Sequence, residues 1–187
     1  MAERRKIFKI VLLGDGAVGK TALRHRYLGE GFKQSYSMTI GADFAVKRVN
    51  LDGEEIVAQI WDLAGQLRFQ SVREVYYQGA TGALLVFDIT RTATFESIPN
   101  WITELMDNNK NKKVPMVLIG NKSDLRESTE GAISRESGQE YADNLSQWSG
   151  QFEIPYVETS ALSGDNVEAA FAQLLRNIEG FLASDKS

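Results

Sequence analysis

Four short apolar runs, each bounded by turn residues, recur along the chain at residues 7–13, 83–89, 114–119 and 154–157. Runs in which nearly every residue is apolar are typical of parallel strands that are covered on both faces of a sheet. The segments between them carry apolar residues at the three-to-four residue spacing of amphipathic helices. This spacing predicts helices at residues 21–28, 95–106, 134–148 and 167–182. The alternation of strands and helices indicates an α/β fold.

Residues 43–62 depart from this alternation. Two stretches of alternating polar and apolar residues flank Asp52-Gly53, a dipeptide that is favoured in two-residue hairpin turns. These two strands are expected to be antiparallel. No repeat, low-complexity tract or linker divides the chain. We therefore expect one three-layer α/β domain over residues 1–187, with its core at about 7–182 and helices on both faces of a six-stranded, mostly parallel sheet with one antiparallel edge strand.

Composition narrows the classes of function. The 187 residues are 43% hydrophobic and 25% charged, and a net charge of -4 gives no sign of general binding to nucleic acid. Cysteine is absent, which excludes disulfides, thiolate metal sites and a cysteine nucleophile, and fits a reducing compartment. No apolar stretch approaches the roughly 18 residues of a membrane-spanning helix, and the N-terminus lacks a signal-peptide cleavage pattern. We expect a cytoplasmic monomer, which would be peripheral to membranes if the native C-terminus is lipidated or through partners.

The segment after the first apolar run has the pattern of a phosphate-binding loop. The pattern G-x-x-x-x-G-K-[ST] lies between a predicted strand and a predicted helix, which is the context that the motif requires. Its glycines let backbone N–H groups surround phosphate oxygens, its lysine adds a positive charge, and its threonine hydroxyl suits Mg²⁺. The alternative is a glycine-rich turn that binds nothing. The motif residues are Gly14, Asp15, Gly16, Ala17, Val18, Gly19, Lys20 and Thr21.

Two later segments can supply further contacts to a metal and to a γ-phosphate. Asp62 ends a predicted strand and begins a D-x-x-G pattern whose glycine is Gly65. A carboxylate there can reach Mg²⁺ through water, and the Gly65 N–H can approach a γ-phosphate. Thr39, in a polar loop, can offer its hydroxyl to Mg²⁺ and its N–H to the same phosphate. Taken alone, each is more often an ordinary turn or loop residue, and only their order after the phosphate loop favours a site.

A tetrapeptide at the end of the third apolar run favours guanine. The sequence N-K-S-D at residues 121–124 follows a predicted strand directly, where open α/β sheets bind their ligands. The Asp124 carboxylate can accept both the ring N–H and the exocyclic amino group of guanine, a donor pair that adenine lacks. Lys122 can lie along the base, and Asn121 can tie this loop to the phosphate loop. A backbone N–H of the T-S-A at residues 159–161 can donate to the guanine carbonyl.

Together these motifs resemble the Ras superfamily, and among its branches the Rab GTPases most closely. The likeness covers residues 8 to about 178, where GDGAVGKT, the loop threonine, WDLAGQ, NKSD and TSA occur in the family's order and near its spacing. The strings IGADF, AQIW, RFQSV, YYQGA and LVFDIT look like Rab signatures. The resemblance implies GTP and GDP as substrate and product, Mg²⁺ as cofactor, and a molecular switch in vesicle trafficking.

The resemblance also implies slow hydrolysis of GTP. Gln66 would orient a water for in-line attack, Lys20 and Mg²⁺ would stabilise the developing charge, and Thr39 and Gly65 would hold the two switches while the γ-phosphate remains. No motif places an arginine as an internal finger, so turnover without a partner is expected to be slow. In Ras and its relatives a partner's arginine is worth roughly 10³ to 10⁵ in rate, which implies an activating protein. An exchange factor is implied as well.

Further contacts follow from the same resemblance. Effector proteins would bind the switches and an aromatic triad of Phe44, Trp61 and Tyr76, although Trp61 can also be read as a residue that covers the sheet. Phe32 would pack against the guanine and Tyr36 would close over the phosphates. Beyond the phosphate loop, the implied nucleotide contacts are Ala22, Phe32, Tyr36, Thr39, Gly65, Asn121, Lys122, Asp124, Leu125, Ser160, Ala161 and Leu162, and the implied metal contacts are Thr21, Thr39 and Asp62.

Two other functions stay open from the sequence. One is a module that binds GTP without hydrolysing it, against which Gln66, Thr39 and Asp62 argue. The other is a P-loop ATPase or small-molecule kinase, against which Asp124 argues. The absence of cysteine also removes the prenylation site that Rab proteins usually carry, so we expect no lipid anchor in this chain. A shortened C-terminus, a soluble protein and a lineage without prenylation are the three explanations.

Overall fold

The computed structural model describes residues 6–34 and 37–185, and these form a six-stranded sheet in the order β2-β3-β1-β4-β5-β6. Strands β1, β3, β4, β5 and β6 are parallel to one another, and β2 is antiparallel to β3 at one edge. This arrangement confirms the predicted fold class. The strands are β1 (Lys6–Leu13), β2 (Ala42–Leu51), β3 (Glu54–Leu63), β4 (Gly82–Asp88), β5 (Met116–Asn121) and β6 (Tyr156–Thr159).

The turn between β2 and β3 has the conformation that its sequence predicts. Asp52 and Gly53 have φ angles of 52° and 93°, and the two residues that flank them, Leu51 and Glu54, face each other in the antiparallel register. Positive φ at both central residues matches the twist of antiparallel strands, which is why an Asp-Gly pair is favoured here. The predicted hairpin is therefore confirmed.

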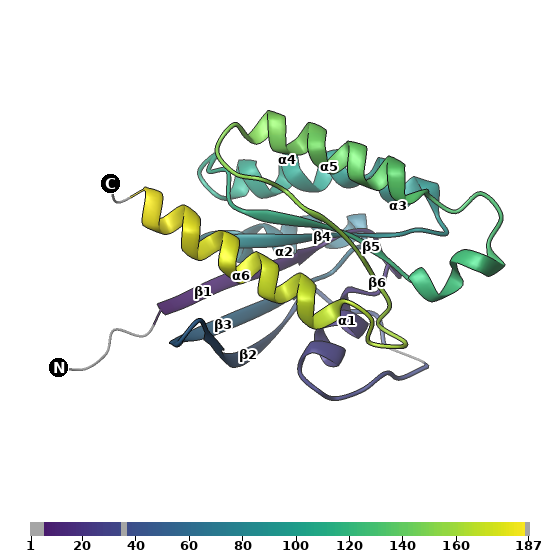
Figure 1. The fold of residues 1–187 in the computed structure, drawn as a ribbon, viewed down its shortest axis with the longest axis horizontal. Coiled ribbons are helices and arrows are strands. Elements are labelled where there is room, and N and C mark those ends of the chain that lie inside the picture. Colours follow the sequence, from purple (N-terminus) through teal and green to yellow (C-terminus); the bar gives the residue numbers. More distant parts are fainter. Residues whose placement is uncertain (1–5, 35–36, 186–187) are drawn as a thin grey trace.

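Helices cover both faces of the sheet (Figure 1). One core contains buried residues of α1 and α6, in which the rings of Tyr27 and Phe171 stack with their centroids 3.8 Å apart. The other core contains Trp101 and Leu105 of α4 and Leu145 of α5. Strands β4 and β5 are buried at every position and are mostly apolar, as expected of parallel strands that helices cover on both faces. The helices are α1 (Lys20–Tyr27), α2 (Gln70–Arg73), α3 (Thr92–Glu96), α4 (Ile98–Asn108), α5 (Arg135–Ser149) and α6 (Val167–Ser184).

The single helix predicted at residues 95–106 is wrong, because the chain forms two helices there. Helix α3 ends at Glu96, and α4 begins at Ile98 with Pro99 in its first turn. Proline has no N–H to donate to the preceding turn, so it interrupts a continuous helix but suits the start of a new one. Three short 3₁₀ turns were also not predicted: η1 (Leu67–Phe69), η2 (Glu74–Tyr76) and η3 (Ser123–Ser128).

The strand order determines where loops meet. Strand β1 lies between β3 and β4. Because these three strands are parallel, the loops that follow them all leave from the carboxyl ends of the strands, next to one another. Open α/β sheets bind ligands at such a position. Within the described parts of the chain, none of the helices combines the length and apolar character needed to cross a bilayer.

Candidate nucleotide and metal site

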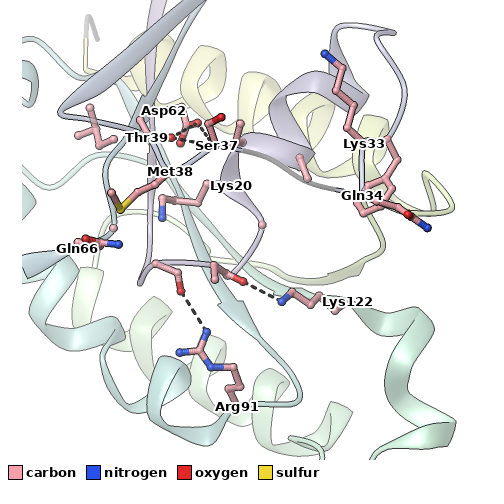
Figure 2. Close-up of a pocket in the computed structure, with 18 residues that line it drawn as sticks. Lys20, Lys33, Gln34, Ser37, Met38, Thr39, Asp62, Gln66, Arg91 and Lys122 are labelled. Atoms are coloured by element: carbon pink, nitrogen blue, oxygen red, sulfur yellow. Dashed lines mark hydrogen bonds between the residues drawn. The ribbon is translucent and has the colours of Figure 1, made fainter.

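The loop between β1 and α1 wraps around the amino group of Lys20. The Lys20 Nζ donates hydrogen bonds to the carbonyl oxygens of Gly14 at 2.6 Å and Asp15 at 3.0 Å. Burial lowers the pKa of Lys20 to about 8, although the nearby carboxylates of Asp62 and Asp15 act in the opposite direction. The loop thus holds a buried amino group at the end of β1, at the centre of the residues in Figure 2.

A cavity of about 570 Å³ opens above this loop. Its volume lies in the usual range for small-molecule and cofactor sites. The predicted site residues that line it are Gly16, Ala17, Gly19, Lys20, Thr21, Ala22, Phe32, Thr39, Asp62, Gly65, Gln66 and Lys122.

Three oxygen-bearing side chains meet beside Lys20, and they come from α1, the loop before β2 and the end of β3. The hydroxyls of Thr21 and Thr39 lie 3.1 Å apart. The Thr21 hydroxyl donates to Asp62 Oδ2 at 2.5 Å, and the Thr39 hydroxyl donates to the same oxygen at 3.5 Å. An all-oxygen group of two hydroxyls and one carboxylate is the chemistry that Mg²⁺ prefers.

Asp62 provides a direct test of whether a cation fits. Its Oδ1 atom is buried and has no hydrogen-bond partner among the residues that the structure describes. Burial raises the pKa of Asp62, and the charge of Lys20 and the hydroxyl of Thr21 only partly oppose that effect. A buried carboxylate in this condition is stabilised by an added positive charge. The residues at this position therefore fit a magnesium ion.

The D-x-x-G segment packs directly against the phosphate loop. A Cβ atom on Gly65 would lie 2.5 Å from the backbone nitrogen of Gly16, so only glycine permits this contact. The Gln66 side chain follows beside Gly16, with its Cγ atom 3.5 Å from the position that a Cβ on Gly16 would take. Gln66 therefore lies at the wall of the cavity, next to the phosphate loop.

The carboxyl ends of β5 and β6 are tied to the phosphate loop through Asn121. The Asn121 side-chain amide donates to the Val18 carbonyl at 2.9 Å, and the Thr159 hydroxyl donates to Asn121 Oδ1 at 2.9 Å. A Cβ on Gly19 would lie 2.3 Å from the Asn121 amide nitrogen, so glycine at this position admits the amide. The predicted connection between the segment at residues 121–124 and the phosphate loop is therefore present.

Asp124 and Lys122 have partners that position them. The Ser160 hydroxyl donates to Asp124 Oδ1 at 2.6 Å. Lys122 Nζ donates to the Ala17 carbonyl at 2.8 Å, as Figure 2 shows, and lies 2.8 Å from Asp88 Oδ2. Burial acts to raise the pKa of Asp88, but hydrogen bonds from Lys122 and Thr90 outweigh it and the pKa is lowered.

Not every predicted contact lines the cavity. Nine predicted nucleotide contacts among the described residues lie beyond its lining, and of these Leu125 and Leu162 are exposed. The loop at Ala161 is held to α1, because Arg26 Nε donates to the Ala161 carbonyl at 3.0 Å. Tyr36 lies outside the described residues. The nine predicted contacts outside the lining are Gly14, Asp15, Val18, Asn121, Asp124, Leu125, Ser160, Ala161 and Leu162.

The sequence reasoning missed several residues around the site, among them Ser97 and Trp101. The Ser97 hydroxyl and the Trp101 indole both donate to the Asp15 carboxylate, at 2.8 Å. Arg91 lines the cavity and donates to the Gly16 carbonyl at 3.2 Å (Figure 2). Asp88 could have been found by the rule that identified Asp62, since it is a carboxylate at a strand's carboxyl end. The contacts of Arg91 and Trp101 carry no local signal.

The aromatic residues of the predicted triad lie next to one another. The ring centroids of Phe44 and Trp61 are 4.6 Å apart, and those of Trp61 and Tyr76 are 5.3 Å apart. Phe44 and Trp61 also face each other across the β2–β3 register. Phe44, Ile40 and Val72 are exposed, and a Cβ on Gly41, next to Ile40, would lie 3.0 Å from Val72 Cγ1. The three rings form one contiguous cluster, in which Trp61 and Tyr76 are partly buried and pack against the core below them.

Comparison with known proteins identifies the family. The profile described as the Ras family matches residues 9–180. The Ras-related protein RABA1b of Arabidopsis thaliana is 44% identical over 172 residues, which cover 92% of this chain and 75% of that protein. The Ypt/Rab-type GTPase YPT7 of Saccharomyces cerevisiae is 41% identical over 182 residues, which cover 95% of this chain and 84% of that protein. The chain therefore belongs to the Ras family and is a Rab-like GTPase.

Proposed function

We propose that this protein is a switch that binds GTP or GDP together with Mg²⁺ and slowly hydrolyses GTP. The observation that supports this most is the convergence of Lys20 with the oxygens of Thr21, Thr39 and Asp62 in one cavity. A positive charge for phosphate and a hard oxygen set for magnesium then lie side by side.

The binding roles follow from the chemistry of each group. Backbone N–H groups of residues 14–21 and the Lys20 ammonium bind the β- and γ-phosphates. Thr21, Thr39 and Asp62 hold the magnesium ion, directly or through water. When bound, Mg²⁺ neutralises negative charge on the phosphate oxygens.

Hydrolysis of GTP requires two further roles, namely orienting the attacking water and contacting the γ-phosphate. The Gln66 side-chain amide, which lies beside Gly16, orients a water toward the γ-phosphate. The Gly65 N–H and the Thr39 N–H contact that phosphate and hold their loops while it remains. An arginine from an activating protein supplies the remaining stabilisation, about 4 to 7 kcal/mol for a rate gain of roughly 10³ to 10⁵.

The guanine base is read by Asp124. Ser160 occupies one site on its Oδ1 atom, and the remaining lone pairs accept the ring N–H and the amino group of the base. The Lys122 stem and Phe32 pack against the base, and Leu125, Ala161 and Leu162 lie around it. Tyr36 closes over the phosphates, as the family resemblance implies.

We extend the proposal to partners and pathway. The surface formed by Phe44, Trp61 and Tyr76, together with the loops that carry Thr39 and Gly65, binds effector proteins. An exchange factor and an activating protein drive the two transitions. The likeness to Rab proteins supports a role in intracellular vesicle trafficking.

A nucleotide competition experiment tests the proposed function. Protein loaded with labelled GDP is incubated with Mg²⁺ and increasing GTP or ATP, and release of the label is measured. We expect GTP to displace the label and ATP to fail, because Asp124 finds no matching donor pair on adenine. Displacement by ATP as effective as by GTP would contradict guanine specificity.

A further inference from the structure

Arg73 is a charged side chain buried outside the nucleotide cavity. It lies at the end of α2, seven residues after Gln66, and only 2% of its surface is exposed. Arginine is rarely buried to this extent unless its charge and its N–H groups are satisfied. Its contacts therefore show what the fold requires at this position.

One edge of the Arg73 guanidinium is held by α4. Nε donates to Glu104 Oε1 at 2.5 Å and an Nη atom donates to Oε2 at 2.8 Å, which makes a bidentate ion pair. The buried Tyr77 hydroxyl donates to Glu104 Oε1 at 2.7 Å. The carboxylate is thus fixed from two sides, and the guanidinium plane is fixed with it.

The opposite edge of the guanidinium contacts the backbone of residues 64–66. The other Nη atom donates to the carbonyl oxygens of Ala64 at 3.1 Å and Gln66 at 2.8 Å. These two carbonyls flank Gly65, which itself packs against the phosphate loop. Arg73 consequently ties α4 to the backbone on both sides of Gly65.

Helix α4 is also connected to the phosphate loop. The Arg73 guanidinium lies 4.5 Å from the ring centroid of Trp101, and the Trp101 indole donates to the Asp15 carboxylate at 2.8 Å. Ser97, next to the start of α4, donates to the same carboxylate. The same helix therefore contacts both the phosphate loop and, through Arg73, the Gln66 backbone.

We infer that Arg73 is a positioning residue for GTP hydrolysis: with Glu104 it holds the carbonyls of residues 64 and 66 so that the Gln66 side chain stays beside Gly16. This inference rests on the proposed role of Gln66. A guanidinium serves a carboxylate on one edge and two carbonyls on the other, whereas the lysine ammonium is a single point on a flexible stem. Arg73→Lys therefore keeps the positive charge but cannot contact the Glu104 carboxylate and the two carbonyls at the same time.

The first experiment measures single-turnover hydrolysis of bound GTP, and GDP affinity, in Arg73→Lys and Glu104→Gln. Misplacement of a catalytic group by about 1 Å can cost roughly 100-fold, so we expect hydrolysis to fall on the order of 10- to 100-fold in both variants. GDP affinity should stay within about twofold of wild type. The matched control is Arg176→Lys, an exposed arginine on α6, which should hydrolyse GTP at the wild-type rate.

A double-variant cycle separates positioning from a general structural effect. If Arg73 acts through Gln66, then adding Arg73→Lys to Gln66→Leu should not slow hydrolysis further. A combined loss equal to the product of the two single losses would overturn the inference, because the two residues would then act independently.

Other results would overturn it as well. These are wild-type hydrolysis in Arg73→Lys, or a loss of GDP affinity large enough to account for the slower hydrolysis. If Arg73→Lys does not fold, Glu104→Gln replaces it in both experiments with the same expectations. Failure of the proposed function is distinguishable, because it appears in the single Gln66→Leu variant as undiminished hydrolysis, or in the wild type as an absence of GDP binding.

Discussion

Asp124 is the residue on which base specificity depends in this account. Asp124→Asn turns two charged acceptor contacts into a mixture of donor and acceptor, so we predict that GDP affinity falls by about 100-fold or more, or roughly 3 kcal/mol. Competition against labelled GDP measures this change. Asp143→Asn, on α5, is the matched control and should bind GDP as the wild type does. Unchanged affinity in Asp124→Asn would show that the base is bound elsewhere.

Asn121 combines a binding role with a structural one. Asn121→Ala leaves the buried Val18 carbonyl and the buried Thr159 hydroxyl without this partner. We predict a loss of about 2 to 4 kcal/mol in the free energy of unfolding, measured by urea denaturation. Asn177→Ala, on the exposed side of α6, should change it by no more than about 0.5 kcal/mol. Equal effects in the two variants would refute the bridging role of Asn121.

Single residues were predictable from the sequence where a local pattern carried them. The phosphate loop, Asp62 and Asn121 each lie at or just after the carboxyl end of a strand within a short motif, and the structure gathers them around one cavity or its adjoining loops. Arg73 and Trp101 were not predictable as parts of the site. Their contacts join segments that are about 30 to 90 residues apart in the chain, and no local pattern encodes such a pairing.

At the scale of elements, the apolar runs predicted which residues are buried more accurately than they predicted where each strand begins and ends. The run at residues 154–157 was predicted as a strand, but β6 spans Tyr156–Thr159. Ile154 is fully buried before the strand begins, and Pro155 has no N–H for the ladder. The short helical turns from Leu67 to Tyr76 show no long apolar period, so pattern alone could not find them.

Two helical glycines are predicted to respond to the same substitution with opposite signs. A Cβ on Gly138 in α5 would lie 2.3 to 2.7 Å from three atoms of the Tyr156 ring, while a Cβ on Gly180 in α6 meets no atom within 4 Å. Gly138→Ala should lower the free energy of unfolding by about 1 to 3 kcal/mol through overpacking. Gly180→Ala should raise it by about 0.5 to 1 kcal/mol, because alanine favours the helix.

Chemical denaturation of the two variants, side by side, checks this pair. The comparison controls for the substitution itself, since both positions lie inside helices. A gain of stability in Gly138→Ala would mean that the Tyr156 ring moves away without cost, and the packing argument for α5 would fail.

For the whole molecule, alternating strands and helices were sufficient to predict the fold class. The order of the strands was not predicted, because it depends on the direction in which each crossover runs. That order places β1 between β3 and β4, and so brings Lys20, Asp62 and Asp88 together at the carboxyl ends of these central strands. The motifs identified the chemistry of the site, whereas the topology brings its parts together.

The central claim is that this fold hydrolyses GTP with Mg²⁺ through Gln66. The most direct test is phosphate release from bound GTP in a single turnover, measured with Mg²⁺ and after its chelation, in the wild type and in Gln66→Leu. We predict slow release by the wild type with Mg²⁺, none above background after chelation, and release that is slower than wild type but still measurable in Gln66→Leu, which should still bind GTP. No release by the wild type with Mg²⁺, or release at the same rate in Gln66→Leu, would contradict the account.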